Sequence, residues 1–152
     1  MRYMRVIQPN IYGFANYRTY LKEFYDVNKS ADSSFSYRYF GQQAGLKSYN
    51  YLKLVVDGAR APTPTFVPGF VRALRLNDRE AVYFQQMIDL THEVRPEKKV
   101  ESFGKLLSLR PSTEKSEISG EKISALEEWY YLPLVELTEV SDFKNESAWM
   151  AR

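Results

Sequence analysis

The chain has 152 residues, of which 44% are hydrophobic and 26% charged, so it is long enough to bury the core of one domain or of two small ones. It contains no cysteine and one histidine, His92, which excludes disulfides, thiolate catalysis and zinc sites built on cysteine. No apolar run approaches the roughly 18 residues that cross a bilayer, and the N-terminus lacks the apolar stretch of a signal peptide. We therefore expect a cytoplasmic protein. We also expect His92 to lie exposed at a helix end rather than to bind a metal.

The N-terminal residues 1–15 have no regular period and contain Pro9 and Gly13, so we expect an irregular arm. After this arm the apolar residues recur at the spacing of α-helices. The predicted helices cover residues 17–28, 37–44, 49–57, 65–75, 78–91 and 97–109. A further helix is expected over residues 120–140, where Pro133 should introduce a kink. The predicted fold class is therefore all-α.

Residues that favour helix ends stand at most of these boundaries. Four polar side chains are placed to accept hydrogen bonds from the first N–H groups of a helix: Asn16, Ser36, Ser48 and Asn77. Gly45 follows the second predicted helix, where a residue without a Cβ adopts the left-handed conformation at little cost. Gly41, within that helix, is expected to permit the close approach of a neighbouring helix. The helix predicted over residues 78–91 is expected to pack through Val82 and four other apolar residues.

The net charge of +2 conceals a difference between the two halves of the chain. Residues 1–76 carry 11 Lys/Arg and 4 Asp/Glu, a net charge of +7, whereas residues 77–152 carry 10 Lys/Arg and 15 Asp/Glu, a net charge of −5. A basic first half favours binding to a polyanion, and an acidic second half favours contacts with protein. The alternative is that the charges are clustered by chance on solvated surfaces.

The most informative stretch of the chain is residues 35–58. It predicts a short helix, a tight turn at Gly45 and a second short helix that stops at Gly58. This is the layout of a helix-turn-helix, in which the second helix enters a groove of DNA. On this interpretation Tyr49 and Asn50 approach bases, while basic side chains hold phosphates. The predicted DNA-binding residues are Arg38, Lys47, Ser48, Tyr49, Asn50, Lys53 and Arg60.

The predicted recognition helix also carries residues that do not suit DNA. Leu54 and Val56 form an exposed apolar pair, which is at least as typical of a protein contact. Asp57 faces phosphates unfavourably unless Arg60 or Arg38 pairs with it. The alternative hypothesis is therefore an adaptor for protein–protein interactions, built on the same scaffold, that contacts its partner through Leu54 and Val56. No pattern of catalytic residues or glycine-rich phosphate loop is present, so we predict neither an enzyme nor a cofactor or metal site.

Residues 33 to 90 resemble the lambda-repressor-like (Xre/Cro-type) family of helix-turn-helix domains. The motifs that carry the resemblance are Phe40-x3-Ala44-Gly45-Leu46, Tyr51-Leu52-x2-Val55, Gly58-x-Arg60 and Ala73-Leu74-x-Leu76. This resemblance implies a five-helix domain that binds double-stranded DNA.

Nearly the whole chain is similar to an uncharacterised bacterial family of helix-turn-helix proteins of the Fibrobacter and Bdellovibrio type, the DUF4423 family. The similar motifs are Tyr17-Arg18-x-Tyr20-Leu21, Phe35-Ser36-Tyr37-Arg38, Ala44-Gly45-Leu46-Lys47-Ser48, Asn50-Tyr51-Leu52-Lys53-Leu54-Val55, Asp57-Gly58 and Trp129-Tyr130. This resemblance implies a transcriptional regulator in which the segment around Trp129 opens a winged-helix-like part.

The predicted organisation is an N-terminal arm over residues 1–15, a helix-turn-helix domain over 16–91 and a helical C-terminal region over 92–152. The C-terminal region is rich in Leu, Phe, Trp and Tyr, so we expect it to extend the core, to form a homodimer face or to begin the winged-helix part. A homodimer is expected because repressor-type motifs commonly bind as symmetric pairs on DNA half-sites. The expected partners are DNA, a second copy of the chain or another protein, and no membrane.

Overall fold

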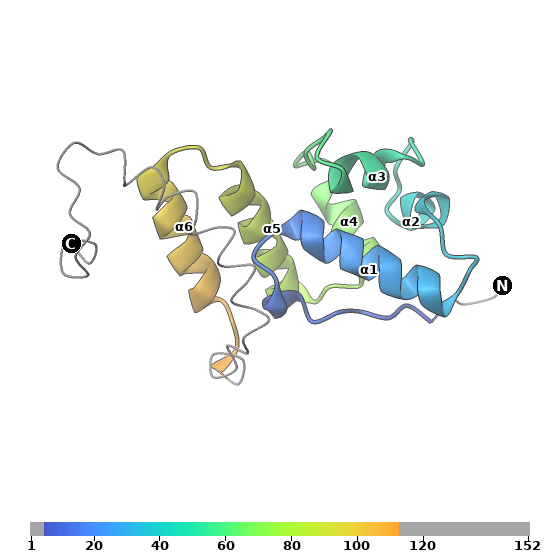
Figure 1. Cartoon of the computed structure of the whole chain (residues 1–152), viewed down its shortest axis with the longest axis horizontal. Coiled ribbons are helices and arrows are strands. Elements are labelled where there is room, and N and C mark those ends of the chain that lie inside the picture. Colours follow the sequence, from blue (N-terminus) through green and yellow to red (C-terminus); the bar gives the residue numbers. More distant parts are fainter. Residues whose placement is uncertain (1–4, 113–152) are drawn as a thin grey trace, which may run out of the picture. The chain divides into compact units, whose positions relative to one another are not determined.

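The structure is a computed structural model that describes residues 5–112 (Figure 1). This part of the chain contains six α-helices and no strand, which confirms the all-α prediction. The elements are the 3-10 turn η1 (Ile11–Gly13), α1 (Tyr17–Ala31), α2 (Tyr37–Gln43), α3 (Tyr51–Val56), α4 (Val67–Leu74), α5 (Asp78–His92) and α6 (Pro96–Ser108). The helix predicted over residues 120–140 lies outside the described residues.

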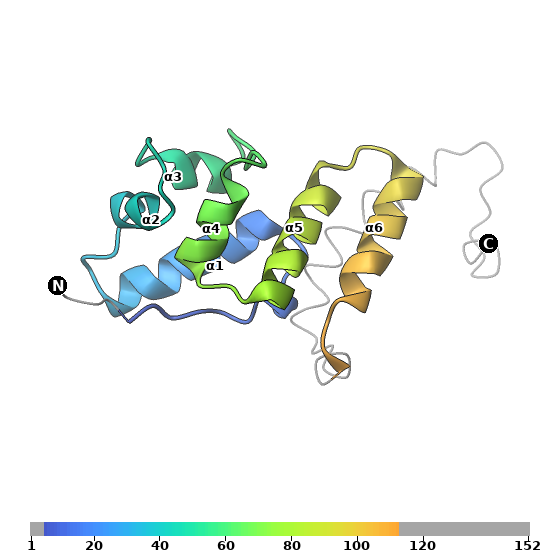
Figure 2. The ribbon, with the colours of Figure 1, turned by 180° about the vertical axis from the view of Figure 1, so that it is seen from behind.

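Helix α5 lies between the first four helices and α6. Figures 1 and 2 show α1 to α4 gathered on one side of α5 and α6 on the other, and α5 contacts α1, α4 and α6. The predicted boundary between the helix-turn-helix domain and the C-terminal region falls at residues 91–92, at the end of α5. Because α5 and α6 pack directly against each other, the described start of the predicted C-terminal region extends the same helical unit.

Aromatic side chains from four helices form the centre of the core. Phe40 of α2 lies edge-on against Phe70 of α4, with ring centroids 5.4 Å apart, and Phe70 stacks on Phe84 of α5 at 6.5 Å. Tyr20 of α1 lies edge-on against Phe84, with ring centroids 6.5 Å apart. All four side chains are fully buried. Aromatic pairs of this kind add about 0.5–1.5 kcal/mol beyond the area they bury, so they tie α1, α2, α4 and α5 into one core.

The irregular N-terminal segment is bound to the helices. Ile7 donates its backbone N–H to Asn28 Oδ1 at 2.8 Å, and Asn28 Nδ2 donates to the Ile7 carbonyl at 2.7 Å. Asn28 is 3% exposed, so this pair of hydrogen bonds is shielded from water. Helix α1 continues to Ala31, three residues past its predicted end at residue 28. Ile11, in η1, is buried where η1 packs on α5. Residues 5–15 are thus part of the packed unit.

Three of the four predicted N-caps are confirmed. The backbone N–H groups of Arg18, Tyr39 and Glu80 donate to the side-chain oxygens of Asn16 at 2.9 Å, Ser36 at 3.1 Å and Asn77 at 3.0 Å, respectively. At Asn77 the Glu80 carboxylate also accepts from the Asn77 N–H at 2.8 Å, which completes a capping box.

The prediction for Ser48 was wrong. The Tyr51 N–H donates to the Ser48 carbonyl at 3.2 Å, so Tyr49 and Asn50 form a turn ahead of the helix. Helix α3 therefore covers Tyr51–Val56 instead of residues 49–57, and its first turn has no side-chain cap.

Two other predictions about the helices need correction. Helix α4 covers Val67–Leu74 instead of residues 65–75, because the Phe66 N–H turns back to the Thr63 carbonyl at 2.8 Å and Arg75 adopts the left-handed conformation at φ 57°. Val82 of α5 was expected to pack but is 55% exposed. The Val82 side chain lies on the solvent side of α5, because the next two residues, Tyr83 and Phe84, lie on its buried side.

Candidate nucleic-acid interface

A tight turn joins α2 to α3, as the sequence predicted. Gly45 adopts φ +68°, its N–H donates to the Gln42 carbonyl at 3.1 Å, and the Leu46 N–H donates to the Gly41 carbonyl at 2.8 Å. This pair of hydrogen bonds is the Schellman motif that ends a helix through a left-handed glycine. Leu46 then enters the core, where it is 6% exposed. The turn directs the chain outward over residues 47–50 before α3 begins.

Helix α4 holds the end of α2 in place. Gly69 packs so closely on α2 that a Cβ there would lie 2.1 Å from the Ala44 carbonyl oxygen. Arg72, one turn further along α4, donates from Nε to the Gln43 carbonyl at 3.3 Å. Gly41, by contrast, has room for a Cβ, whose nearest neighbour would be Tyr49 Cα at 3.5 Å. The close approach expected at Gly41 is therefore found at Gly69.

Helix α3 is held by contacts from outside itself. Six residues are too few for a helix to be stable alone, since isolated helices shorter than about 12 residues are marginal in water. Leu52 and Val55 are fully buried beneath it. The Val55 carbonyl at its end accepts from Arg18 Nε of α1 at 3.1 Å, and Tyr51 at its start donates its hydroxyl to the Ala61 carbonyl at 2.9 Å. The core and both polar contacts together fix how α3 is presented.

All of the predicted DNA-binding side chains are exposed to solvent. They are Arg38, Lys47, Ser48, Tyr49, Asn50, Lys53 and Arg60. Two of them are in contact, because the Arg38 guanidinium carbon lies 5.0 Å from the centre of the Tyr49 ring in a cation–π arrangement. Tyr49 remains 45% exposed, so one part of the ring is held by Arg38 while the other part faces solvent.

Lys53 is paired within its own helix. Its ammonium group forms an ion pair with Asp57, four residues later, and this hydrogen bond raises the pKa of Lys53. Asp57 was expected to need Arg60 or Arg38 as its partner, and the structure assigns that role to Lys53 instead. Both side chains of the pair are about half exposed. Asp57 consequently compensates part of the positive charge of Lys53, whereas Lys47 makes no ion pair with another described residue.

The segment from residue 33 to 77 contains a strong excess of positive charge. Its charged residues are Arg38, Lys47, Lys53, Arg60, Arg72 and Arg75 against Asp57 alone, and all six basic residues are exposed. Arg72 was not predicted, yet its guanidinium lies 3.2 Å from where a Gly45 Cβ would be, directly beside the turn. The sequence signal for Arg72 was the basic excess of residues 1–76, since no local motif identifies it.

The apolar pair proposed as a protein contact is less exposed than expected. Leu54 and Val56 are both half-buried, because α3 packs on α1 and α2 through more of its surface than its innermost stripe. Figure 1 shows α3 and its flanking loops at the upper edge of the helical unit, above α1 in that view. The outward surface of this edge is therefore mainly polar and basic.

His92 lies exposed at the last position of α5, as predicted. Its Nε2 is 2.9 Å from the Tyr17 hydroxyl, and partial burial, together with the nearby Arg18, lowers the pKa of His92. Within residues 5–112, no cluster of three or more His, Asp or Glu side chains is arranged to hold a metal ion. In the same range no helix is long and apolar enough to cross a membrane.

Comparison with known protein families, with curated proteins and with solved structures found no match to this chain.

Proposed function

We propose that the chain is a DNA-binding transcriptional regulator of the lambda-repressor-like type, which places α3 and the preceding turn against double-stranded DNA. One observation carries the proposal: an outward-facing turn and short helix lie within a 45-residue segment that has six exposed basic residues and one acidic residue. Phosphate contacts supply most of the affinity of proteins for DNA, so a surface of this charge suits that partner. The remaining acidic group, Asp57, is already paired with Lys53.

The exposed residues divide into two roles. Lys47, Arg60 and Arg72 lack partners among the described carboxylates and are suited to hold phosphates, as guanidinium and ammonium groups do in most protein–DNA contacts. Asn50 and Tyr49 precede α3 and carry the donors and acceptors that approach base edges. Because Arg38 lies over one part of the Tyr49 ring, it limits the orientations in which Tyr49 meets a base.

The test is a salt titration of the full chain on random duplex DNA, followed by selection and sequencing of the retained fragments. We expect a steep loss of affinity with salt and an enriched sequence motif. Lys47→Ala should weaken binding to all sequences and reduce the salt slope by about one unit, because it removes one phosphate contact. Lys98→Ala is the matched control, since Lys98 is an exposed lysine on α6, away from α3. Equal binding by the two variants would remove the basis of the proposal.

The Lys53–Asp57 pair gives the same experiment a second arm. Asp57→Asn leaves the shape of the side chain but releases the Lys53 charge, so the variant should bind DNA more tightly and with a steeper salt slope than the unmodified chain. Lys53→Ala should then weaken binding less than Lys47→Ala does. If Asp57→Asn leaves both affinity and slope unchanged, α3 does not face the phosphates.

The proposal includes binding as a symmetric pair on two half-sites, with the second copy held through residues 92–152. Light scattering at micromolar concentration tests this part separately. A dimer would have twice the monomer mass of 17.8 kDa, and a monomer that still selects a single half-site would confine the proposal to DNA binding.

A further inference from the structure

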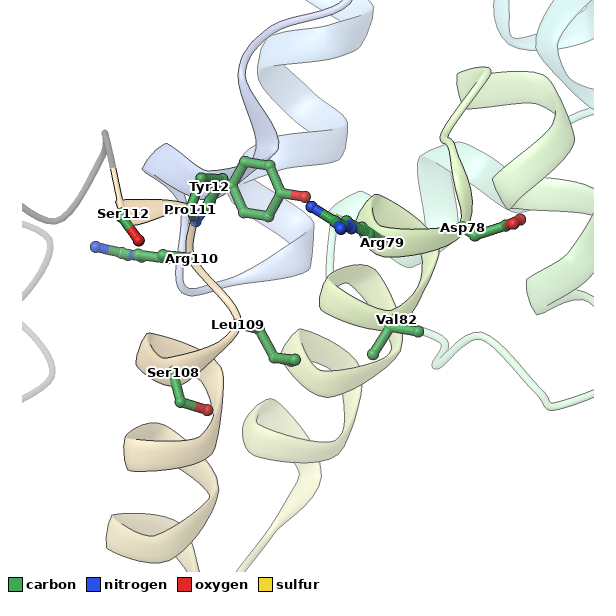
Figure 3. Close-up of a pocket in the computed structure, with 9 residues that line it drawn as sticks. All are labelled: Tyr12, Asp78, Arg79, Val82, Ser108, Leu109, Arg110, Pro111 and Ser112. Carbon is green, nitrogen blue, oxygen red and sulfur yellow. The ribbon is translucent and has the colours of Figure 1, made fainter.

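A pocket of about 660 Å³ lies at the start of α5, away from α3. It is formed by η1, the first turns of α5 and the end of α6, and it includes Tyr12, Arg79, Val82, Ser108, Leu109 and Arg110 (Figure 3). Its volume falls within the range of about 300–1,000 Å³ that is typical of small-molecule sites. Neither the sequence motifs nor the proposed DNA contact uses these residues.

One wall of the pocket is cationic and rich in hydrogen-bond donors. Figure 3 shows the Tyr12 hydroxyl pointing toward the guanidinium group of Arg79. Arg79 is exposed and forms no ion pair with a carboxylate of the described residues. Arg110 is positioned by its Nε, which donates to the Tyr83 hydroxyl at 3.2 Å, while that hydroxyl donates to the Phe14 carbonyl at 2.7 Å.

The apolar wall of the pocket is formed by Val82, one turn along α5 from Arg79, and by Leu109. Val82 projects from α5 and Leu109 from the end of α6, and Figure 3 shows the two side chains directed toward each other across the gap between the helices. Val82 is 55% exposed, whereas the solvent-facing side of a surface helix normally carries polar residues. An apolar group seated between Val82 and Leu109 would remove this surface from water.

We propose that this pocket binds a small monocarboxylate with a short apolar body. A guanidinium group matches a carboxylate in a planar, two-point hydrogen bond, and Arg79 supplies such a group in the pocket. The lining carries two arginines against Asp78, a net charge of +1 that suits a monoanion better than a phosphate with two charges. The apolar body then lies against Val82 and Leu109, which places the two chemical ends of the ligand on the two walls.

Hexanoate is the probe for this site, and the measurement is the change in amide NMR shifts of the full chain at constant ionic strength. We expect saturable shifts at Arg79, Val82 and Leu109, with weaker responses to hexanol, which lacks the charge, and to inorganic phosphate, which lacks the apolar body. Shifts that do not saturate, or phosphate binding as tightly as hexanoate, would overturn the proposal. The measurement reports ligand binding directly, so its outcome does not depend on whether α3 binds DNA.

Two variants separate the walls. Arg79→Gln should weaken hexanoate binding about tenfold or more, and Lys98→Gln, which removes an exposed charge outside the pocket, should leave it unchanged. Val82→Ser should weaken hexanoate but not acetate, because acetate does not reach the apolar wall. Both altered positions are accessible to solvent, so the variants are expected to fold. Equal hexanoate affinity in the unmodified chain and Arg79→Gln would refute the site.

Discussion

The close contact between α4 and the end of α2 predicts that a side chain at Gly69 destabilises the fold. Replacing Gly69 with alanine would put a methyl carbon 2.1 Å from the Ala44 carbonyl oxygen and 3.2 Å from the carbonyl carbon. Carbon and oxygen atoms that are not bonded pack at about 3.5 Å, so the two backbones would have to separate by more than about 1 Å. Neither partner is a flexible side-chain end, and the whole strain falls on α4 and on the helix-ending turn at Gly45.

Two opposing effects set the size of the change. Alanine in a helix interior is favoured over glycine by about 1 kcal/mol, whereas overpacking a rigid core costs about 1–3 kcal/mol. Since the overlap at Gly69 involves backbone, we take the upper end of that range and expect Gly69→Ala to lower the free energy of unfolding by about 2 kcal/mol. Gly104 provides the control, because it is also helical but a Cβ there meets no atom within 4 Å. Gly104→Ala should raise the free energy of unfolding by up to about 1 kcal/mol.

Equilibrium unfolding in urea measures the free energy of unfolding of both variants. An unchanged slope of that free energy against urea concentration shows that the folded and unfolded states expose the same surface as in the unmodified chain. The difference between Gly69→Ala and Gly104→Ala removes the helix preference that both share and leaves the clash, which should be about 2–3 kcal/mol. If the two variants are stabilised to the same extent, α4 does not approach Ala44 as the structure has it.

Two further predictions concern side chains that join distant elements. Asn28→Ala should lower the free energy of unfolding by about 2 kcal/mol and speed amide exchange at Ile7, because the N–H and carbonyl of Ile7 lose their partner; unchanged exchange at Ile7 would contradict this. Partial burial of the exposed His92 lowers its pKa, and the nearby Arg18 adds to the effect, so the folded state binds a proton less readily than the unfolded chain. The stability this contributes is present above pH 6.5, the ordinary pKa of histidine, and is lost as the pH falls through the lowered folded value. An imidazole titration by NMR with a midpoint at or above 6.5 would show that the reasoning about His92 is wrong.

Local chemistry was enough to predict most helix ends. Asn16, Ser36 and Asn77 act within three residues of the N–H groups they accept from, and Gly45 ends α2 by its own backbone conformation. A local backbone turn replaces the expected cap at Ser48, because the Tyr51 N–H donates to the Ser48 carbonyl and α3 begins only after Asn50. The existence of each described helix was therefore predictable from apolar spacing and caps, while the bounds of α3 and α4 were not.

Contacts between elements distant in sequence were beyond prediction from one chain. Gly41 and Gly69 are both helical glycines, and only the packing of α4 on α2 shows that Gly69 is the one that excludes a side chain. Arg72 likewise reaches the turn from a different helix. The Lys53–Asp57 pair is different, because opposite charges four residues apart at a helix can be recognised from the sequence.

The way α3 is held separates residues that build the interface from residues that are available to bind. Arg18 and Tyr51 fix the two ends of α3 through its backbone and the following loop, and Leu52 and Val55 fix its inner side. Substitutions at these positions should change stability and DNA affinity together, because the helix cannot hold its own shape. Lys47 and Asn50, in contrast, are exposed, and their side chains form no hydrogen bond with the described residues. Asn50 holds the N-cap position of α3, but its side chain accepts no hydrogen bond from the helix. A loss of DNA affinity at these exposed positions without a loss of stability is therefore the signature that distinguishes a binding surface from solvated scaffold.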